Sequence, residues 1–221
     1  MWDLSKHERI EMEVLQGLNS QKILQHLIFC GGTMLRLCHG LNRYSVDLDF
    51  WILEKTAIEK VFDTINQYLK EHYRLRKAEN KHTSLYFEFG LKGYPRHLII
   101  EVRKDKEGVK YEEKIAFSKH SNIQVMVKAA ALEEMMKAKI KTFLERARIR
   151  DAFDIEFILR RGIEIKANAE QIKGIESLIM RFKPNDYKIT LGSLLEYKDR
   201  RHYRTANFRY LLENLKVNQI L

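Results

Sequence analysis

Residues 47–53 constrain the fold of this chain more than any other stretch. Acidic and apolar side chains alternate over residues 47–50, and most residues of the stretch are aromatic or branched. This pattern predicts a β-strand. Residues two apart on a strand point to the same face of a sheet. Asp47 and Asp49 therefore project together, while Leu48 and Phe50 point into the core. The sequence thus predicts a sheet that carries two neighbouring carboxylates on one face.

Two carboxylates held this close repel each other, and a bound divalent cation removes that cost. Magnesium prefers oxygen ligands, and phosphoryl transfer uses such cations to align the attacking oxygen and to neutralise charge. Asp47 and Asp49 therefore predict a magnesium (or manganese) site. We expect Glu101 to complete it, because a carboxylate is out of place in the apolar run of residues 98–102. The alternative is a Glu101 side chain that faces solvent.

A glycine pair precedes this strand. Gly31 and Gly32 allow a close approach of the backbone to a triphosphate, and Thr33 can cap a short helix whose free amides bind phosphate. Arg36 and Arg43 flank the carboxylate strand on its N-terminal side and could balance phosphate charge. Taken alone, the glycines also fit an ordinary turn and each arginine fits a solvated surface. Their place shortly before the paired aspartates favours nucleotide binding.

The predicted helix of residues 131–147 carries a lysine on its apolar side. Its apolar stripe follows three- and four-residue spacing and consists of Leu132, Met135, Met136, Ile140, Phe143 and Leu144. Lys139 projects between Met135 and Phe143, and burying an unpaired ammonium is costly, so we expect an anionic partner. A nucleotide phosphate or a nearby carboxylate meets this need. The alternative is a lysine that reaches solvent at the edge of the stripe.

Asp151 and Asp154 follow this helix and share one face if a second helix begins there. Asp151 suits a helix N-cap and Asp154 suits a first turn, and the local sequence favours these roles over chemistry. An ion pair from either aspartate to Lys139 is a further option.

The rest of the pattern separates a mixed N-terminal part from a helical C-terminal part. We expect helices over residues 5–27 and 56–71 and strands over residues 85–91, 98–104 and 111–117. The first two of these strands form an antiparallel pair. Helical patterns dominate after about residue 124. We therefore predict an α+β chain with a domain of residues 1–120 and a helical domain of residues 121–221.

The composition narrows the setting in which the chain works. Its 221 residues carry a net charge of +10, which favours polyanionic partners such as nucleic acid or nucleotides over a merely basic surface. No apolar run approaches the roughly 18 residues of a membrane span, and the polar N-terminus does not resemble a signal peptide. Cys30 and Cys38 lack the spacing of a zinc site, and we interpret them as free thiols. We expect a cytoplasmic protein without membrane contact.

Two blocks of the sequence together resemble one protein family. The first comprises Gly31-Gly32-Thr33 with Leu35 and Arg36, and then Arg43-x-Ser45-x-Asp47-Leu-Asp49-Phe50. It is similar to the opening motif of the AbiEii/AbiGii toxin family, which are nucleotidyltransferase-like proteins of abortive-infection toxin–antitoxin systems. The second block, similar to a later family motif, comprises Lys139, Arg146, Arg150, Asp151 and Asp154.

The resemblance implies a polymerase-β-like nucleotidyltransferase fold, in which a mixed sheet with flanking helices precedes a helical C-terminal domain. It implies metal ligation by Asp47 and Asp49, with NTP as the substrate. It also implies triphosphate binding by the glycine motif, with Ser45 among the nucleotide-binding residues. A nucleotide contact by Lys139 and a catalytic base at Asp151 follow from the second block. The third metal position varies in the family, so Glu101 rests on its own strand pattern.

We therefore expect a magnesium-dependent nucleotidyltransferase that moves a nucleotide from an NTP to an acceptor. The acceptor that we expect is RNA, in particular tRNA, and the resemblance implies a toxin that has an antitoxin partner. Two alternatives stay open on the sequence. One is nucleotidylation of a protein side chain, and the other is a non-catalytic nucleic-acid-binding module with the same fold.

Overall fold

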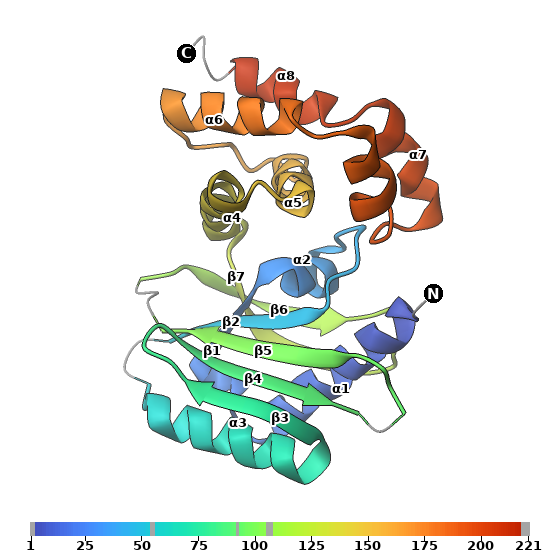
Figure 1. Ribbon diagram of the computed structural model, residues 1–221. Helices are drawn as coiled ribbons and strands as arrows, with labels where there is room; N and C mark the ends of the chain where they lie inside the picture. Colours follow the sequence, from blue (N-terminus) through green and yellow to red (C-terminus); the bar gives the residue numbers. More distant parts are fainter. Residues whose placement is uncertain (1–2, 54–55, 92, 105–107, 218–221) are drawn as a thin grey trace. The chain divides into compact units, whose positions relative to one another are not determined.

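The computed structural model describes residues 3–53, 56–91, 93–104 and 108–217. The chain forms two compact units (Figure 1). The sheet unit comprises Met1–Gly40 and Tyr44–Ala131, and the helical unit comprises Leu41–Arg43 and Leu132–Leu221. The division after Ala131 lies beyond the predicted boundary at residue 120, because the sheet continues through residues 124–130.

Within the described residues, the sheet unit forms one mixed sheet of seven strands in the order β3-β4-β5-β2-β1-β7-β6. The strands are β1 Leu27–Cys30, β2 Asp47–Ile52, β3 Arg74–Asn80, β4 Ser84–Gly90, β5 His97–Arg103, β6 Tyr111–Phe117 and β7 Gln124–Ala130. Strand β2 pairs antiparallel with β1 and parallel with β5. The carboxylate strand β2 is therefore held by a neighbour on each side, at the centre of the sheet.

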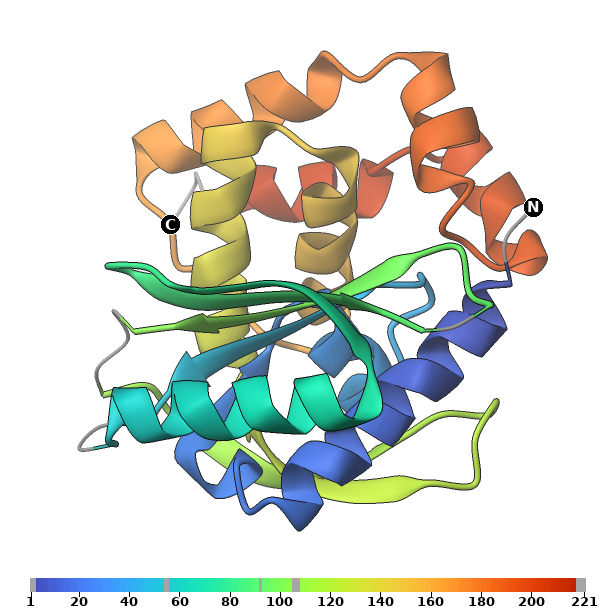
Figure 2. The ribbon, with the colours of Figure 1, turned by 60° about the horizontal axis from the view of Figure 1, so that its bottom comes forward.

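The two faces of the sheet differ in what covers them. Leu48 lies opposite Ile100, which lies opposite Phe87, so these three side chains share a face. Phe87 packs on Phe62 of α3 (Ile58–His72), with 5.2 Å between the ring centroids. Helix α1 (Leu4–Ser20) contacts α3, and both lie on this side of the sheet (Figure 2). Burial of each large apolar side chain here contributes about 1.5–3 kcal/mol.

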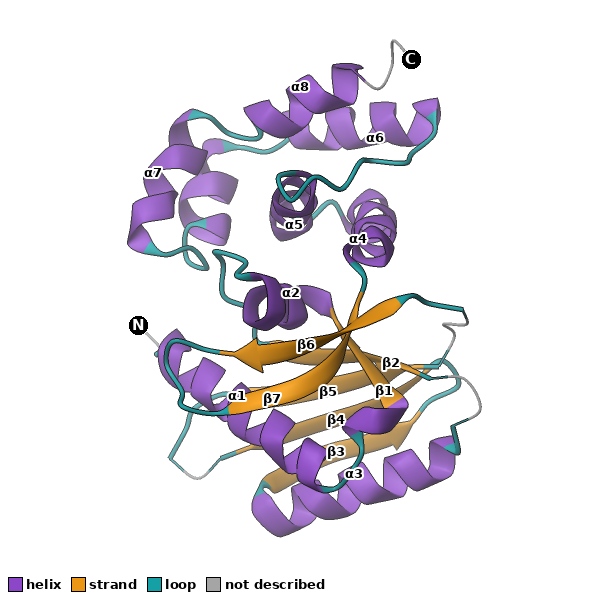
Figure 3. Cartoon of the chain, turned by 180° about the vertical axis from the view of Figure 1, so that it is seen from behind, coloured by secondary structure: helices purple, strands orange, loops and turns teal. Residues whose placement is uncertain are grey.

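Helix α2 (Gly31–His39) lies on the other face of the sheet, against β2 and β6 (Figure 3). It follows β1 directly and ends at Gly40, whose φ of 75° is the left-handed conformation that commonly ends helices. Asp47 and Asp49 alternate with Leu48 along β2, so they point to this second face. The sheet therefore separates the apolar core below β2 from the carboxylates above it.

The helical unit contains α4 Leu132–Arg146, α5 Ile149–Leu159, α6 Ala169–Met180, α7 Tyr197–Thr205 and α8 Arg209–Val217, with a π-helical turn at Asp186–Leu191. Phe208 is fully buried and contacts the rings of Phe182, Tyr187 and Tyr203. This aromatic cluster gives the unit a core of its own. Across the described residues, no helix has the length and apolarity needed to cross a membrane.

The α+β class and the predicted strands of the sheet are confirmed. Strands β2, β4, β5 and β6 lie where they are predicted within one or two residues, and β4 pairs antiparallel with β5. The prediction of helix from about residue 124 is wrong at its start. Strand β7 occupies Gln124–Ala130 and buries Val125, Val127 and Ala129 in alternation, and α4 begins only at Leu132. The short alternating run joins the helix without a glycine or proline to separate them.

Candidate active site

The carboxylates of β2 and β5 share one face of the sheet. Asp49 lies directly opposite Glu101 in the parallel register, so their side chains point the same way, and Asp47 lies two residues before Asp49. All three side chains are half-buried, whereas the intervening Leu48 and Ile100 are fully buried. The strand register therefore places Glu101 beside the paired aspartates, as its sequence pattern suggests.

A metal ion on this face of the sheet would need ligands from the side chains that point to it. Among the residues that the structure describes, no three or more His, Cys, Asp or Glu side chains are placed to hold a metal ion. Asp47 and Asp49 nevertheless offer two accessible carboxylates on one face, and such oxygen donors suit magnesium. The residues present thus fit the cation through this pair, and a role for Glu101 as the third ligand stays a prediction.

Gly31 lies against the carboxylate of Asp49. Its φ is 77°, a conformation that favours glycine, and a β-carbon there would stand 2.3 Å from Asp49 Oδ2. Because α2 begins at Gly31, the unpaired amides and the positive dipole end of that helix lie next to the carboxylate strand. The glycine motif thus allows a helix N-terminus to reach an acidic site, which is an arrangement suited to phosphate.

Thr33 does not cap the helix, because α2 begins two residues earlier, with Cys30 at the N-cap position. Thr33 is fully buried inside the first turn, and its hydroxyl donates a 2.6 Å hydrogen bond to the backbone oxygen of Asp47. The Thr33 hydroxyl, which is predicted to cap the helix, instead fixes the backbone at the start of β2. Gly32 is buried beside it, and Ser45 is half-buried two residues before Asp47.

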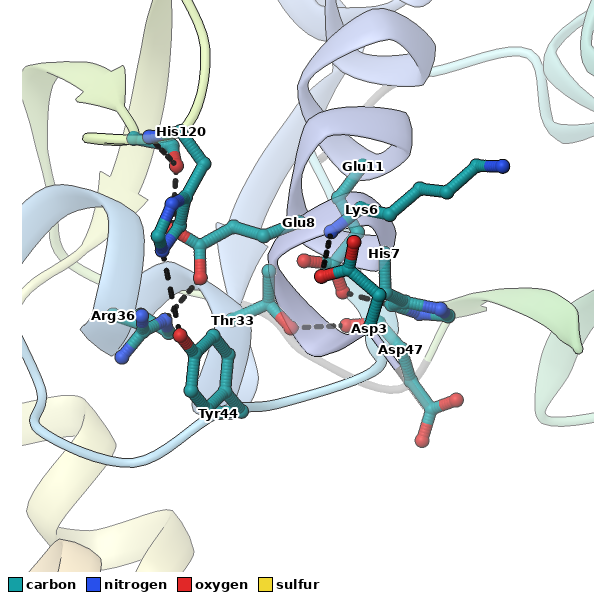
Figure 4. Close-up of polar contacts among 11 residues, drawn as sticks. Asp3, Lys6, His7, Glu8, Glu11, Thr33, Arg36, Tyr44, Asp47 and His120 are labelled. Carbon is teal, nitrogen blue, oxygen red and sulfur yellow. Dashed lines mark hydrogen bonds and ion pairs between the residues drawn. The ribbon is translucent and has the colours of Figure 1, made fainter. Parts of the chain in front are cut away.

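Arg36 pairs with Glu8 of α1, and its guanidinium lies 3.9 Å from the ring centroid of Tyr44 (Figure 4). Its side chain is nearly buried, at 8% exposure. A cation held between a carboxylate and an aromatic face is already stabilised within the protein. The position of Arg36 therefore differs from the solvated or phosphate-facing site that the sequence suggests.

Helix α1 contributes three buried polar residues that sequence reasoning missed. His7, Glu8 and Glu11 are at most 3% exposed, and they lie on the same helix face as buried Leu15. Their signal in the sequence is the one that identified Lys139, namely charged side chains at three- and four-residue spacing on an apolar stripe. The aspartate strand therefore has a second polar neighbour, α1, besides α2.

Burial shifts the pKa values of two of these groups in opposite directions. Burial raises the pKa of Glu11 well above 4.5, and the negative charges of Glu8 and Asp47 raise it further. Neither Glu11 oxygen has a hydrogen-bond partner in the described structure, although His7 Nε2 lies 3.7 Å from Oε1. Burial lowers the pKa of His7. Both groups thus favour their neutral forms beside Asp47.

The helical unit holds the second set of predicted residues. Asp154 is fully buried and accepts hydrogen bonds of 2.6 Å from both Nε and Nη2 of Arg43. Lys139 Nζ lies 2.6 Å from Asp154 Oδ2 and 3.5 Å from Asp151 Oδ1. Burial alone would raise the pKa of Asp154, but Arg43 and Lys139 hold it below its usual value.

This cluster supplies the anionic partner that the position of Lys139 requires, and it also engages Arg43. Helix α5 begins at Ile149 with Arg148 at the cap, so Asp151 lies in the first turn and is not the N-cap residue. One Asp151 oxygen, Oδ2, is buried without a hydrogen-bond partner in the described structure. The nucleotide-binding and catalytic roles of Lys139 and Asp151 stay predictions.

The fold is shared with two solved structures from Helicobacter pylori. JHP933 is 17% identical, with a TM-score of 0.50 over 92% of this chain and 95% of that chain. A protein described as a nucleotidyltransferase is 18% identical, with a TM-score of 0.51 over 91% and 96% of the two chains. The mixed sheet and the helices that follow it therefore have the fold of nucleotidyltransferases.

Residues 13–204 match the family model described as nucleotidyl transferase AbiEii toxin, type IV toxin–antitoxin (TA) system. The chain belongs to this family, which confirms the resemblance of its motifs. No curated protein sequence matches the chain. It is thus a nucleotidyltransferase-family toxin.

Proposed function

We propose that this protein transfers a nucleotide from an NTP to an RNA acceptor, with magnesium (or manganese) held by Asp47 and Asp49. The observation that carries the proposal is the joint position of these aspartates and the start of α2. Two carboxylates share a sheet face, and Gly31 brings a helix N-terminus against one of them. A nucleoside triphosphate site needs carboxylates that hold a cation and free amides that bind phosphate.

Asp47 and Asp49 would hold the metal, with Glu101 beside Asp49 as the third candidate ligand. When bound, the metal would neutralise triphosphate charge and help to align the acceptor oxygen with the phosphorus. The backbone amides of Gly31, Gly32 and Thr33 would bind phosphate oxygens. Because the Thr33 hydroxyl already donates to Asp47, its contribution in this structure is to position that aspartate.

The reaction needs a base as well as a phosphate site. In the transfer, the acceptor oxygen bonds to the α-phosphorus, the bond between α-phosphorus and bridging oxygen breaks, and pyrophosphate leaves. We assign the acceptor proton to Asp151, for which the family resemblance suggests the role of base and whose Oδ2 lacks a hydrogen-bond partner among the described residues. Lys139 would contact the nucleotide, and its side chain retains 12% exposure.

Two properties of the chain support RNA as the acceptor and a toxin role. The net charge of +10 favours a polyanion over a neutral protein surface. The family is one of type IV toxin–antitoxin systems, so an antitoxin partner follows for a functional system. Arg36 and Arg43 are predicted to bind nucleotide, but they pair with Glu8 and Asp154. Their contribution is therefore to hold α2 and the segment before β2 in place.

The test uses the full chain with magnesium, each α-labelled NTP in turn, and total tRNA. We expect label on RNA, and we expect Asp49→Asn to lower the rate at least about 100-fold because it removes charge at the metal site. Asp63→Asn, at an exposed aspartate of α3, is the matched control and should retain the wild-type rate. Transfer that survives Asp49→Asn would show that the site is elsewhere.

The same assay separates the other two functions. Label on added or endogenous protein, with none on RNA, would indicate nucleotidylation of a side chain. Salt-sensitive RNA binding that is unaffected by chelation and by Asp47→Asn, without label transfer to any fraction, would indicate a non-catalytic module. Either outcome would overturn RNA as the acceptor of a transferred nucleotide.

A further inference from the structure

The N-terminal helix α1 buries polar side chains where an amphipathic helix normally buries apolar ones. His7 and Glu8 are 1% and 3% exposed, and both precede residue 13, where the match to the family model begins. Buried polar groups are costly unless they have partners. His7 has a partner in the segment that leads into β2, and Glu8 reaches the same segment through Arg36.

His7 holds the backbone immediately before Asp47. Its Nε2 lies 3.0 Å from the backbone oxygen of Val46, and its Nδ1 lies 3.0 Å from the hydroxyl of Tyr94. A carbonyl oxygen only accepts, so Nε2 carries the proton and donates, and in the neutral ring Nδ1 accepts from Tyr94. The next carbonyl along the chain, that of Asp47, accepts from Thr33. Two successive carbonyls at the start of β2 are thus fixed by side chains from α1 and α2.

Glu8 takes part in a closed ring of contacts that reaches the same segment. Its Oε1 accepts a 2.5 Å hydrogen bond from Ser118, and its Oε2 pairs with Arg36, which stacks on Tyr44. The Tyr44 hydroxyl lies 3.3 Å from Nε2 of His120, and the His120 backbone amide donates to Ser118 Oγ at 3.0 Å. The ring joins α1 and α2 to the segment before β2 and to the turn between β6 and β7 (Figure 4).

The segment from Tyr44 to Asp47 is therefore held at three points: a tyrosine ring and two backbone carbonyls. Two of these depend on α1, through Glu8 with Arg36 and through His7. We propose that His7 and Glu8 are positioning residues for nucleotidyl transfer, which set the direction of Asp47 by fixing the backbone that precedes it. This inference rests on the proposed function for its consequence in catalysis, although the anchoring itself can be measured separately.

The first experiment compares His7→Phe with His7→Gln in the full chain. Phenylalanine removes the donor to Val46, whereas a glutamine amide can replace it. Misplacement of a catalytic group by about 1 Å can cost about 100-fold, so we expect His7→Phe to lower kcat about 10- to 100-fold with little change in KM for NTP. His7→Gln should recover most of the loss. His82→Phe, at an exposed histidine, is the control and should leave kcat unchanged.

The second experiment does not need activity. Amide hydrogen exchange over residues 44–49 should be faster in His7→Phe and in Glu8→Gln than in the wild-type chain, with other strands unaffected. Tyr94→Phe removes one hydroxyl from a half-buried ring and should cause a smaller increase in exchange over the same residues. This variant replaces His7→Phe in the test if His7→Phe does not fold.

Three outcomes would overturn the proposal. Unchanged exchange over residues 44–49 in folded variants would show that α1 does not anchor the segment. Unchanged kcat in an active protein would show that the anchoring has no effect on transfer. A loss of kcat that His7→Gln does not recover would deny the role of the donated hydrogen bond. A wild-type chain without transferase activity, but with the expected change in exchange, would instead refute the proposed function alone.

Discussion

The two units of the protein each bury a carboxylate completely, yet they treat its charge in opposite ways. In the helical unit, Asp154 has two cationic neighbours, Arg43 and Lys139, and its pKa is lowered. In the sheet unit, burial raises the pKa of Glu11, the charges of Glu8 and Asp47 raise it further, and the lowering influences of Arg36 and Thr33 do not offset this. Both residues are 0% exposed. Burial is the same, so the balance of neighbouring charges decides which form of the acid is stable.

The difference shows what each cluster does for its unit. Asp154 stays ionised and links Arg43, from the segment before β2, to α4 and α5 of the helical unit. The raised pKa of Glu11 favours its protonated form, and Arg36 pairs with Glu8 instead. One cluster is an ion network that holds helices together, whereas the other contains an acid whose pKa is raised by burial and by the charges of Glu8 and Asp47.

Removal of the charge on Asp154 should have the largest effect. Asp154→Asn leaves Arg43 and Lys139 buried without a full countercharge, and breaking a buried pair typically costs about 3–5 kcal/mol. We expect a loss of that size in the free energy of unfolding, measured by urea denaturation. The control is Asp63→Asn at an exposed site, which should change stability by less than about 0.5 kcal/mol. A loss below about 1 kcal/mol for Asp154→Asn would contradict the network.

Lys139→Met should have an intermediate effect, because Arg43 still pairs with Asp154. A hydrogen bond to a charged group contributes about 1.5–3 kcal/mol, so we expect a loss within this range by the same denaturation measurement. The matched control is Lys141→Met, an exposed lysine on the same helix. If Lys139 also contacts nucleotide, Lys139→Met should lower kcat/KM more than Lys141→Met does, at a temperature where both variants are folded. Wild-type kcat/KM in the folded variant would leave Lys139 with a purely structural role.

Glu11→Gln should have the smallest effect and the opposite sign. The folded pKa of Glu11 is raised, so its favourable contribution is complete below the unfolded value of 4.5 and is lost as pH rises through the folded pKa. Glutamine resembles the protonated acid at every pH. We expect the variant to match the wild type near pH 4 and to exceed it in stability by a margin that grows as the pH rises toward 8.

The control for this prediction is Glu13→Gln, an exposed glutamate on the same helix. It should show no gain that grows with pH. A stability difference for Glu11→Gln that is constant between pH 4 and pH 8 would be inconsistent with a raised pKa, and it would remove the contrast with Asp154.

The strands that the sequence predicts are those with clear alternation, such as β2, β4 and β5. The strands that it does not predict lack this pattern for physical reasons. All four residues of β1 are buried, so its run of apolar residues is continuous and reads equally well as part of a helix. Strand β3 lies at the edge of the sheet and consists mostly of charged residues, such as Arg74 and Lys77, which protect an edge but hide its alternation.

The features of the candidate site likewise include some that the sequence predicts and some that it does not. The neighbourhood of Asp49 and Glu101 follows from strand pattern, because a parallel partner strand brings a same-face carboxylate alongside. The partners of Arg36 could not be predicted, because pairing with Glu8 depends on how α1 crosses the sheet unit, a contact between residues 28 apart in the chain. The fixation of Val46 and Asp47 by His7 and Thr33 is likewise a product of tertiary packing, which local sequence does not encode.

The assignment of Leu41–Arg43 to the helical unit has a further consequence for the integrity of the chain. Residues on either side of this tripeptide belong to the sheet unit, so the backbone crosses between the units after residues 40, 43 and 131. A protease cut or premature stop after Ala131 would therefore leave Arg43 tethered to the sheet fragment. That fragment would lack Asp154 and the bridge to Leu195. Arg43, four residues upstream of Asp47, thus takes its partners from residues of the helical unit that are encoded more than a hundred positions later.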